Sequence, residues 1–318
     1  MTAAKKFAST GDMTEKKISF TKIGDGLYAF TAEGDPNTGV IIGDDSVMVI
    51  DAQATPKMAQ KVIDCVKSVT SKPIRYVLLS HYHAVRVLGA SAYNADEIIA
   101  SEGTYELIKE RGKEDWASEF GRFPRLFQAA DTIPGLTWPT ITFKKEMSLF
   151  MGKRRVDIMF LGRGHTAGDT VAYVPDANVI FTGDLVEYHS SCYCGDAYFT
   201  DWPKTLDKVA AFNASALLAG RGAPLTSPQM VKDAIAMTRE FLSTLYSSVQ
   251  ESVKKGHNLK QAFDECHKIM QPKFHNYTIF EHNQPFNIAR AYDEAKGIDH
   301  PNIWTDKRDL EMWHALQS

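Results

Sequence analysis

The sequence has few cysteines, no strong excess of either charge and no long apolar run. Its 4 cysteines are scattered along 318 residues, which argues against a disulfide framework. The 36 Lys and Arg against 39 Asp and Glu give a net charge of -3, so the charge footprint of a nucleic-acid or anionic-membrane binding protein is missing. Lys5 and Lys6 precede no apolar segment of a signal peptide. We expect a cytoplasmic protein that binds a small-molecule substrate. The sequence leaves open whether the protein forms a homo-oligomer.

Short β-rich runs occur in two separate parts of the chain. The first set, within residues 18–51, is broken by Gly-Asp turns, and the second set lies within residues 141–182. Between them, Thr55 and Pro56 form the N-cap and the first turn of a predicted helix. Two strand-rich halves with helices between and after them predict an α/β sandwich of two sheets flanked by helices.

Helices are predicted in the middle and at the end of the chain. One helix is expected near residues 104–111, and residues 116–139, which show no clear period, are expected to form a loop-rich insertion. From Ser227 onward, apolar residues recur at helical spacing. We therefore expect a core over residues 1–225 and a C-terminal helical region over residues 226–318 packed on it.

Four residues that can bind metals follow apolar runs that are predicted to be strands. His81 and His83 come after one such run, and because side chains alternate along an extended backbone, both imidazoles would project to the same side. His165 and Asp184 follow two later strands. Two histidines alone would be read as surface or core residues, but the set of four favours a metal site. A site that keeps its histidines without binding metal is the alternative.

At these positions the chain resembles the metallo-β-lactamase superfamily. The signature of that superfamily is a strand-end Asp, the motif H-x-H-x-D-H, and then single His, Asp or Cys, and His residues at later strand ends. Asp51 fits the first element, and His81 and His83 begin the second. His165 and Asp184 fit the next two. The resemblance implies an αββα sandwich with additional C-terminal helices.

The chain also departs from this signature. Val85 and Arg86 stand where the motif has Asp and His, and Arg221 stands where the last His is expected. The resemblance implies that these positions surround a second metal, whereas the first metal site, formed by the three histidines with Asp184 bridging, is intact. We predict one divalent ion, with zinc as the first candidate and iron or manganese as alternatives.

Arg86 and Arg221 place two permanent positive charges where the second dication of the superfamily lies. We expect one of them to pair with Asp184 while the two together bind an anionic group of the substrate. The simpler alternative is that both are ordinary salt-bridge partners of Asp184.

Val85 removes a carboxylate that, in the resemblance, helps to handle the proton of the attacking water. Asp184 is the best remaining candidate for a catalytic base, and Tyr188 and His189 are weaker ones. Asp51 is expected to orient one of the ligand histidines.

The resemblance implies a metal-dependent hydrolase that acts on a small, anionic ester, lactone, thioester or amide. A non-hydrolytic anion-binding protein on the same scaffold is the main alternative, and a metal-dependent oxygenase or oxidoreductase is a third. Cys192 and Cys194 are expected to pack rather than to bind metal. For His282 a solvated or helix-capping position is expected, and a position facing the pocket, if this region folds over it, is the alternative.

Overall fold

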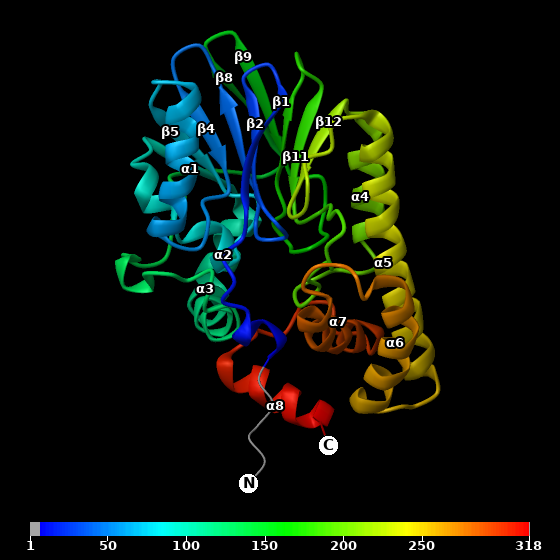
Figure 1. Ribbon diagram of the computed structural model, residues 1–318. Helices are drawn as coiled ribbons and strands as arrows, with labels where there is room; N and C mark the ends of the chain where they lie inside the picture. Colours follow the sequence, from blue (N-terminus) through cyan, green and yellow to red (C-terminus); the bar gives the residue numbers. More distant parts are fainter. Residues whose placement is uncertain (1–6, 318) are drawn as a thin grey trace.

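A computed structural model describes residues 7–317 and shows two β-sheets packed face to face between layers of helices (Figure 1). The first sheet has 7 strands in sequence order and is mixed, since β1 to β4 are antiparallel and β4 to β7 are parallel. Its strands are β1 (Ile18–Gly24), β2 (Leu27–Ala32), β3 (Thr38–Ile42), β4 (Val47–Ile50), β5 (Ile74–Leu78), β6 (Glu97–Ser101) and β7 (Ile141–Phe143).

The second sheet has 5 strands in the order β12-β11-β10-β9-β8 and is also mixed, with a parallel β11–β12 pair. Its strands are β8 (Glu146–Met151), β9 (Arg154–Met159), β10 (Val171–Val174), β11 (Val179–Gly183) and β12 (Ala216–Ala219). The predicted sandwich of two sheets is therefore confirmed.

Helices cover the outer faces of both sheets. The helical segments are η1 (Ala8–Gly11), α1 (Pro56–Val69), α2 (Ala84–Val87), η2 (Ala90–Tyr93), α3 (Glu102–Arg122), η3 (Ala130–Thr132), α4 (Trp202–Ala211), α5 (Pro228–Lys254), α6 (Leu259–Phe274), α7 (Phe280–Ala295) and α8 (Asp306–Gln317). α1 and α3 pack on the first sheet, and α4 and α5 on the second (Figure 1). Within residues 7–317, none of these helices combines the length and the apolarity that a membrane span requires.

Strand periodicity explains why the sheets are buried on both faces. In β4, Met48 and Ile50 point into the core between the sheets, whereas Val47 and Val49 point toward α1. The helix α1 begins as predicted, because the Thr55 side chain accepts a hydrogen bond from the Met58 N–H at 3.2 Å. β4 and the C-terminal part of β5 are apolar and are followed by polar residues such as Asp51 and His81. These polar side chains therefore lie at the edge where the strands end.

The prediction for residues 116–139 is wrong in its first part, because α3 extends from Glu102 to Arg122. The inward face of its last turns is polar: Asp115, Ser118, Glu119 and Arg122 are all buried. The C-terminal half of α3 therefore lacks the regular spacing of apolar residues by which a helix is predicted from sequence.

The C-terminal helices connect the two halves of the molecule. α5 lies along α4, α6 and α7 pack against α5, and α8 reaches back to α3 (Figure 1). The Ser118 hydroxyl on α3 donates to Asp309 on α8 at 2.6 Å. The predicted boundary between a core over residues 1–225 and a C-terminal region over residues 226–318 remains a prediction. Residues of α4 and α5, from either side of this boundary, share one apolar core.

Candidate metal centre

Three buried histidines meet at the edge where strands of both sheets end. His81 and His83 follow β5, and His165 lies in the loop between β9 and β10. Their ring centroids are 4.6 to 4.9 Å apart and the rings are nearly perpendicular. One nitrogen from each ring lies within 4.8 Å of the other two. The sequence-predicted set therefore converges in space.

The orientation of His81 is set through Ser80 by Asp51. The Ser80 N–H and hydroxyl both donate to the Asp51 carboxylate at 2.8 Å, and the Ser80 oxygen lies 2.9 Å from Nδ1 of His81. Because the hydroxyl proton is already directed at Asp51, the serine oxygen accepts the proton of His81 Nδ1. This leaves the lone pair of His81 Nε2, which has no hydrogen-bond partner among the described residues, facing the other histidines.

The other two rings are held in the same manner. Nδ1 of His165 lies 2.8 Å from the Tyr193 carbonyl oxygen, and Nε2 of His83 lies 3.2 Å from Asp196. The inner nitrogens, Nε2 of His165 and Nδ1 of His83, are 3.0 Å apart. Burial opposes protonation of His83, but the carboxylates of Asp115 and Asp196 outweigh it and raise the pKa of His83 to about 9.

Asp184, which follows β11, faces the same centre. Its Oδ2 lies 3.8 Å from Nε2 of His81 and 3.7 Å from Nε2 of His165, and its Oδ1 accepts a hydrogen bond from Arg86. Burial alone would raise the pKa of Asp184, but Arg86 and the two histidines hold it far below its usual range. The carboxylate is therefore ionised across the physiological range.

Arg86 is fully buried, and both of its terminal nitrogens are bonded to protein. NH1 donates to the Asn37 carbonyl at 2.9 Å and lies 3.6 Å from Asp51, while NH2 donates to the Gly220 carbonyl at 2.8 Å and to Asp184. Such a guanidinium is a fixed positive charge beside Asp184. The expected contact of Arg86 with substrate remains a prediction. Its two terminal nitrogens already donate hydrogen bonds to Asn37, Gly220 and Asp184.

Arg221 differs from Arg86 in having a terminal nitrogen without a partner, whereas in Arg86 only Nε lacks one among the described residues. It follows β12 and is 6% exposed, and its NH1 has no hydrogen-bond partner among residues 7–317. It lines a small pocket together with Phe123 and Asp35, and it contributes to the lowered pKa of Asp184. Its predicted role in binding an anion is therefore compatible with its surroundings.

The family model of the metallo-beta-lactamase superfamily matches residues 31–221, which include all three histidines, Asp184 and both arginines. The chain belongs to this superfamily. The αββα sandwich of the metallo-beta-lactamase type, with helices α5–α8 added after it, is thereby confirmed.

Individual relatives of this superfamily member are distant. A metallo-beta-lactamase type 2 of Bacillus cereus is 24% identical over 189 residues, which are 58% of this chain and 65% of that protein. A linear primary-alkylsulfatase of Pseudomonas sp. (strain ATCC 19151) is 20% identical over 252 residues, covering 67% of this chain and 46% of that protein. The chain thus spans less than two thirds of either relative.

Solved structures agree in fold. A metallo-beta-lactamase from Pontibacter korlensis superposes with a TM-score of 0.57 at 17% identity, over 71% of this chain and 99% of that one. The DIM-1 metallo-beta-lactamase gives a TM-score of 0.55 at 16% identity, over 73% and 99% of the two chains. This likeness covers the fold and leaves the substrate open.

Two acidic residues of α3 support the histidine segment in this metallo-beta-lactamase fold, and the sequence analysis missed both. The Ala84 N–H donates to Asp115 at 2.7 Å and the Val85 N–H donates to Glu119 at 2.9 Å. These carboxylates cap the N-terminus of α2, directly after the histidines. Their spacing of four residues places both on one helix face, but the loop predicted for residues 116–139 includes Glu119, and the helix predicted near residues 104–111 ends before Asp115.

The other candidate residues lie outside the histidine cluster. The Cys194 N–H donates to the Asn287 side chain at 2.7 Å, and the Asn287 amide donates to the Cys192 carbonyl at 2.8 Å, so this segment attaches α7 to the core. His189 contacts the rings of Tyr188 and Tyr277. The expectation for His282 is wrong, because this histidine is buried.

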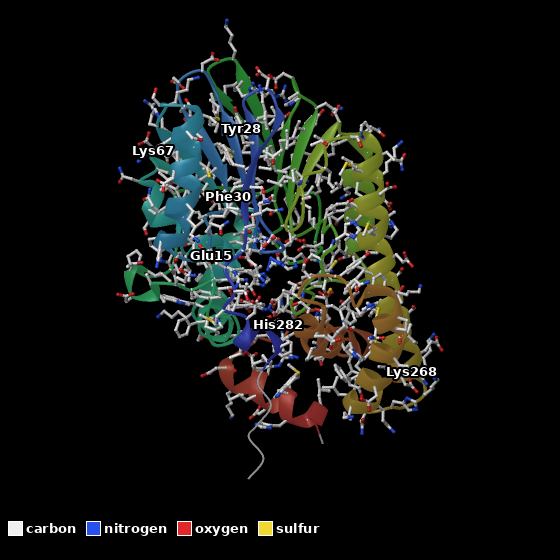
Figure 2. The ribbon with its side chains drawn as sticks, viewed as in Figure 1. Glu15, Tyr28, Phe30, Lys67, Lys268 and His282 are labelled. Carbon is white, nitrogen blue, oxygen red and sulfur yellow. The ribbon has the colours of Figure 1, made fainter. Side chains whose placement is uncertain are left out.

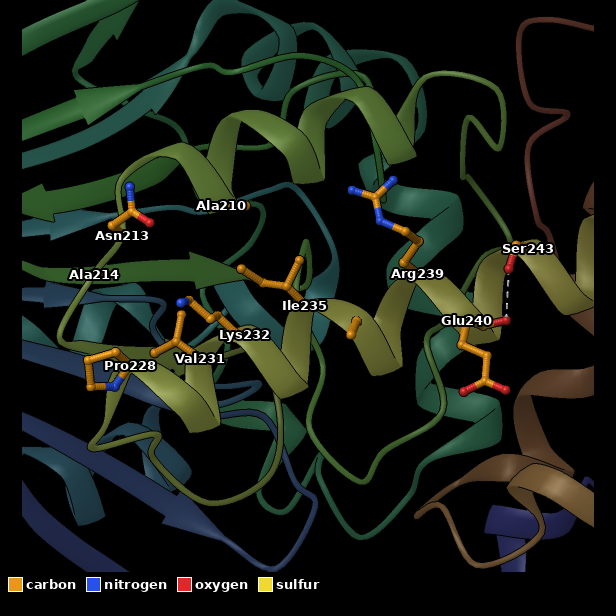
Figure 3. Close-up of a pocket in the computed structure, with 11 residues that line it drawn as sticks. Ala210, Asn213, Ala214, Pro228, Val231, Lys232, Ile235, Arg239, Glu240 and Ser243 are labelled. Atoms are coloured by element: carbon orange, nitrogen blue, oxygen red, sulfur yellow. Dashed lines mark hydrogen bonds between the residues drawn. The ribbon is translucent and has the colours of Figure 1, made fainter.

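A surface groove with mostly apolar walls lies away from this centre. It runs between α4 and α5 and is lined by residues such as Ala214, Val231, Ile235 and Arg239 (Figure 3). None of the three histidines lines it. Its size alone therefore does not make it the reaction site.

Removing the positive charge of Arg86 is expected to destabilise the fold. Arg86→Met leaves Asp184 buried without its cation, which costs about 3–5 kcal/mol of unfolding free energy. Urea denaturation measures this loss. The matched variant is Arg86→Met with Asp184→Asn, in which part of the loss should be recovered because position 184 no longer holds an unpaired buried charge. A loss below about 1 kcal/mol in Arg86→Met would contradict the assigned role.

The turn that carries His165 has its own titrating group, Asp169. This carboxylate accepts two hydrogen bonds from the Thr166 N–H, at 3.0 and 2.9 Å, and one from its hydroxyl at 2.6 Å. Burial raises the pKa of Asp169 to about 7, although the bonds from Thr166 oppose this. The folded state therefore binds this proton more tightly than the unfolded chain, whose value is 3.8.

The stability of the wild type should consequently fall, relative to Asp169→Asn, as the pH rises from about 4 to about 7. The contribution is fully present below the unfolded pKa and is lost as the pH passes the folded pKa, with a slope of up to about 1.4 kcal/mol per pH unit. Asparagine keeps the shape and an acceptor oxygen but does not titrate. Urea unfolding of both proteins across this range provides the test, and a constant difference between them would rule the assignment out.

Proposed function

We propose that this metallo-beta-lactamase superfamily member is a metal-dependent hydrolase that holds one divalent ion, zinc first, between His81, His83 and His165. The convergence of the three inner nitrogens supports this proposal. In a tetrahedral zinc site with Zn–N distances of about 2.0–2.1 Å, neighbouring nitrogens lie roughly 3.3 Å apart. The 3.0 Å separation of the inner nitrogens of His83 and His165, and the unpartnered Nε2 of His81, fit such a group.

A divalent ion bound there would act as a Lewis acid toward a carbonyl and would lower the pKa of its bound water to about 7. Around it, the outer bonds to Ser80, Tyr193 and Asp196 keep the three rings in one orientation. A fixed ring orientation avoids reorganisation when the substrate reacts.

Asp184 is proposed to orient the attacking water by accepting its hydrogen bond. Its carboxylate oxygen faces the same centre as the histidines. Because Arg86 and the histidines hold its pKa far below its usual range, Asp184 is a weak base at neutral pH. We therefore propose that Asp184 positions the attacking water and, where it contacts the ion, serves as a ligand. Proton transfer is the less suitable role for this carboxylate.

The proposed substrate is a small ester, lactone, thioester or amide with an anionic group. The names of the relatives, metallo-beta-lactamase and alkylsulfatase, agree with hydrolysis in general. Arg221, with its free donor, is the proposed contact for the anionic group. A non-hydrolytic anion-binding protein is the second candidate, because Val85 supplies no acid and Asp184 is a weak base.

Metal removal and replacement test the proposal on a panel of nitrophenyl esters, thioesters, lactones and anilides. Chelation should abolish turnover and zinc, iron(II) or manganese should restore it. His165→Ala should lower turnover at least about hundredfold and weaken metal binding, since the site loses one of three ligands. His275→Ala, at an exposed histidine at the end of α6, is the matched control and should behave as the wild type.

Two results would refute hydrolysis at this centre. Full turnover by protein from which all metal has been removed would exclude the three histidines as its origin. Metal-loaded protein that binds anions but turns over no member of the panel would favour the second candidate.

A further inference from the structure

His282 of α7 lies inside the molecule, at the junction of α3, α7 and the N-terminal turn η1 (Figure 2). It is 2% exposed, and neither ring nitrogen has a hydrogen-bond partner among residues 7–317. Its ring centroid is 4.0 Å from that of Phe123, and it stacks on Phe286 at 5.8 Å with an angle of 22°. A buried imidazole without a protein partner is a polar group left for a ligand.

Arg122, the last residue of α3, lies beside this histidine. Its Nε donates to the Ser118 carbonyl at 3.2 Å and lies 3.6 Å from Asp309, but neither NH1 nor NH2 has a partner among the described residues. The guanidinium carbon lies 4.2 Å from the centroid of the Phe286 ring. The side chain is thus fixed by its inner end and by an aromatic face, while the two terminal nitrogens remain free.

This place adjoins the metal centre. The ring of Tyr193 lies 5.5 Å from the guanidinium carbon of Arg122, and its centroid is 5.4 Å from that of His83 and 6.1 Å from that of His165. One aromatic side chain therefore separates Arg122 from the histidines. A ligand that reached both would pass along this ring.

Arg221 approaches the same place from β12. It lines a small pocket together with Phe123, whose ring contacts His282. After burial, Arg122 and Arg221 are the charges that lower the pKa of His282. The ring of Phe123 connects the three side chains: it lies 5.9 Å from the guanidinium carbon of Arg122, contacts His282 and lines the pocket of Arg221. Each of the three carries at least one nitrogen without a partner among the described residues.

We infer that Arg122, Arg221 and His282 form a recess that binds an oxyanion, a carboxylate or a sulfonate-type group carried on an apolar body. Buried charged donors without partners are costly, and a guanidinium fork is satisfied by two oxygens of one anion. The rings of Phe123, Phe286 and Tyr193 supply apolar walls. The site formed by Arg122, Arg221 and His282 is called the oxyanion recess below.

The role of the oxyanion recess in selecting a substrate rests on the proposed hydrolysis. Binding of an anion in the recess does not depend on that proposal. His282 lies beyond residues 31–221, the part of the chain that matches the superfamily model. The C-terminal helices would therefore give this chain a substrate preference that the matched region alone does not provide.

Binding of benzoate, benzenesulfonate and neutral benzamide to the metal-loaded full chain tests the recess by calorimetry. Benzoate or benzenesulfonate should bind at least about tenfold tighter than benzamide, and the better of the two identifies the preferred oxyanion. Arg122→Gln should weaken that binding at least about tenfold. Arg122→Lys, which keeps the charge but loses the fork, should weaken it as well and serves if the glutamine variant does not fold.

Arg290→Gln is the matched control, because Arg290 is equally buried but its three nitrogens are bonded to Ala197, Ile298, Glu294 and Asp299. It should bind the anion as the wild type does. Unchanged anion binding in the Arg122 variants, or equal binding of benzamide, would overturn the recess.

The recess and the hydrolysis fail in different ways. If benzoate binding depends on Arg122 but no ester is hydrolysed, the recess stands and the hydrolase proposal falls. If neutral and carboxylate-bearing esters are hydrolysed equally by the wild type and by Arg122→Gln, hydrolysis stands and the recess falls.

Discussion

A buried ion pair between Arg86 and Asp184 holds together the edge at which the two sheets meet. Arg86 also bonds the carbonyls of Asn37 and Gly220, and it lies 3.6 Å from Asp51, so one guanidinium links segments that follow or precede β3, β4, β11 and β12. A buried charge of this kind is stable only while its partner stays ionised and in place. His81 and His165 face the other oxygen of Asp184, so this pair also fixes the carboxylate that these two histidines meet.

The same pair sets the chemistry that the centre can perform. A guanidinium does not lose its charge at neutral pH, and we propose that Arg86 supplies the positive charge that a second metal would supply in the superfamily pattern. It keeps Asp184 ionised, which favours ligation and positioning but makes the carboxylate a weak base. Arg122 and Arg221 offer the unpartnered donors that the oxyanion recess would present to a substrate, beside a centre that also holds the carboxylates of Asp184 and Asp196. The proposed preference for anionic substrates thus rests on these donors.

Much of this arrangement follows from local sequence patterns, and some of it does not. His81, His83, His165 and Asp184 could be found because each follows an apolar strand, and strand ends gather at one edge of a sheet. Nothing local shows that Arg86 bonds two backbone carbonyls from distant loops. The polar face of α3 was missed because helix prediction follows apolar spacing, and that face turns its carboxylates and Arg122 inward. The position of His282 depends on how α7 folds back, which is a tertiary effect.

The number of metal ions per chain tests most directly whether Arg86 takes the place of a second ion. Zinc titration followed by elemental analysis, with anomalous diffraction from the zinc-loaded crystal, gives both the count and the position. The account predicts one ion per chain, bound by His81, His83 and His165, with Arg86 still bonded to Asp184. Two ions per chain, with the second on Asp184 and the Arg86 side chain displaced, would contradict it.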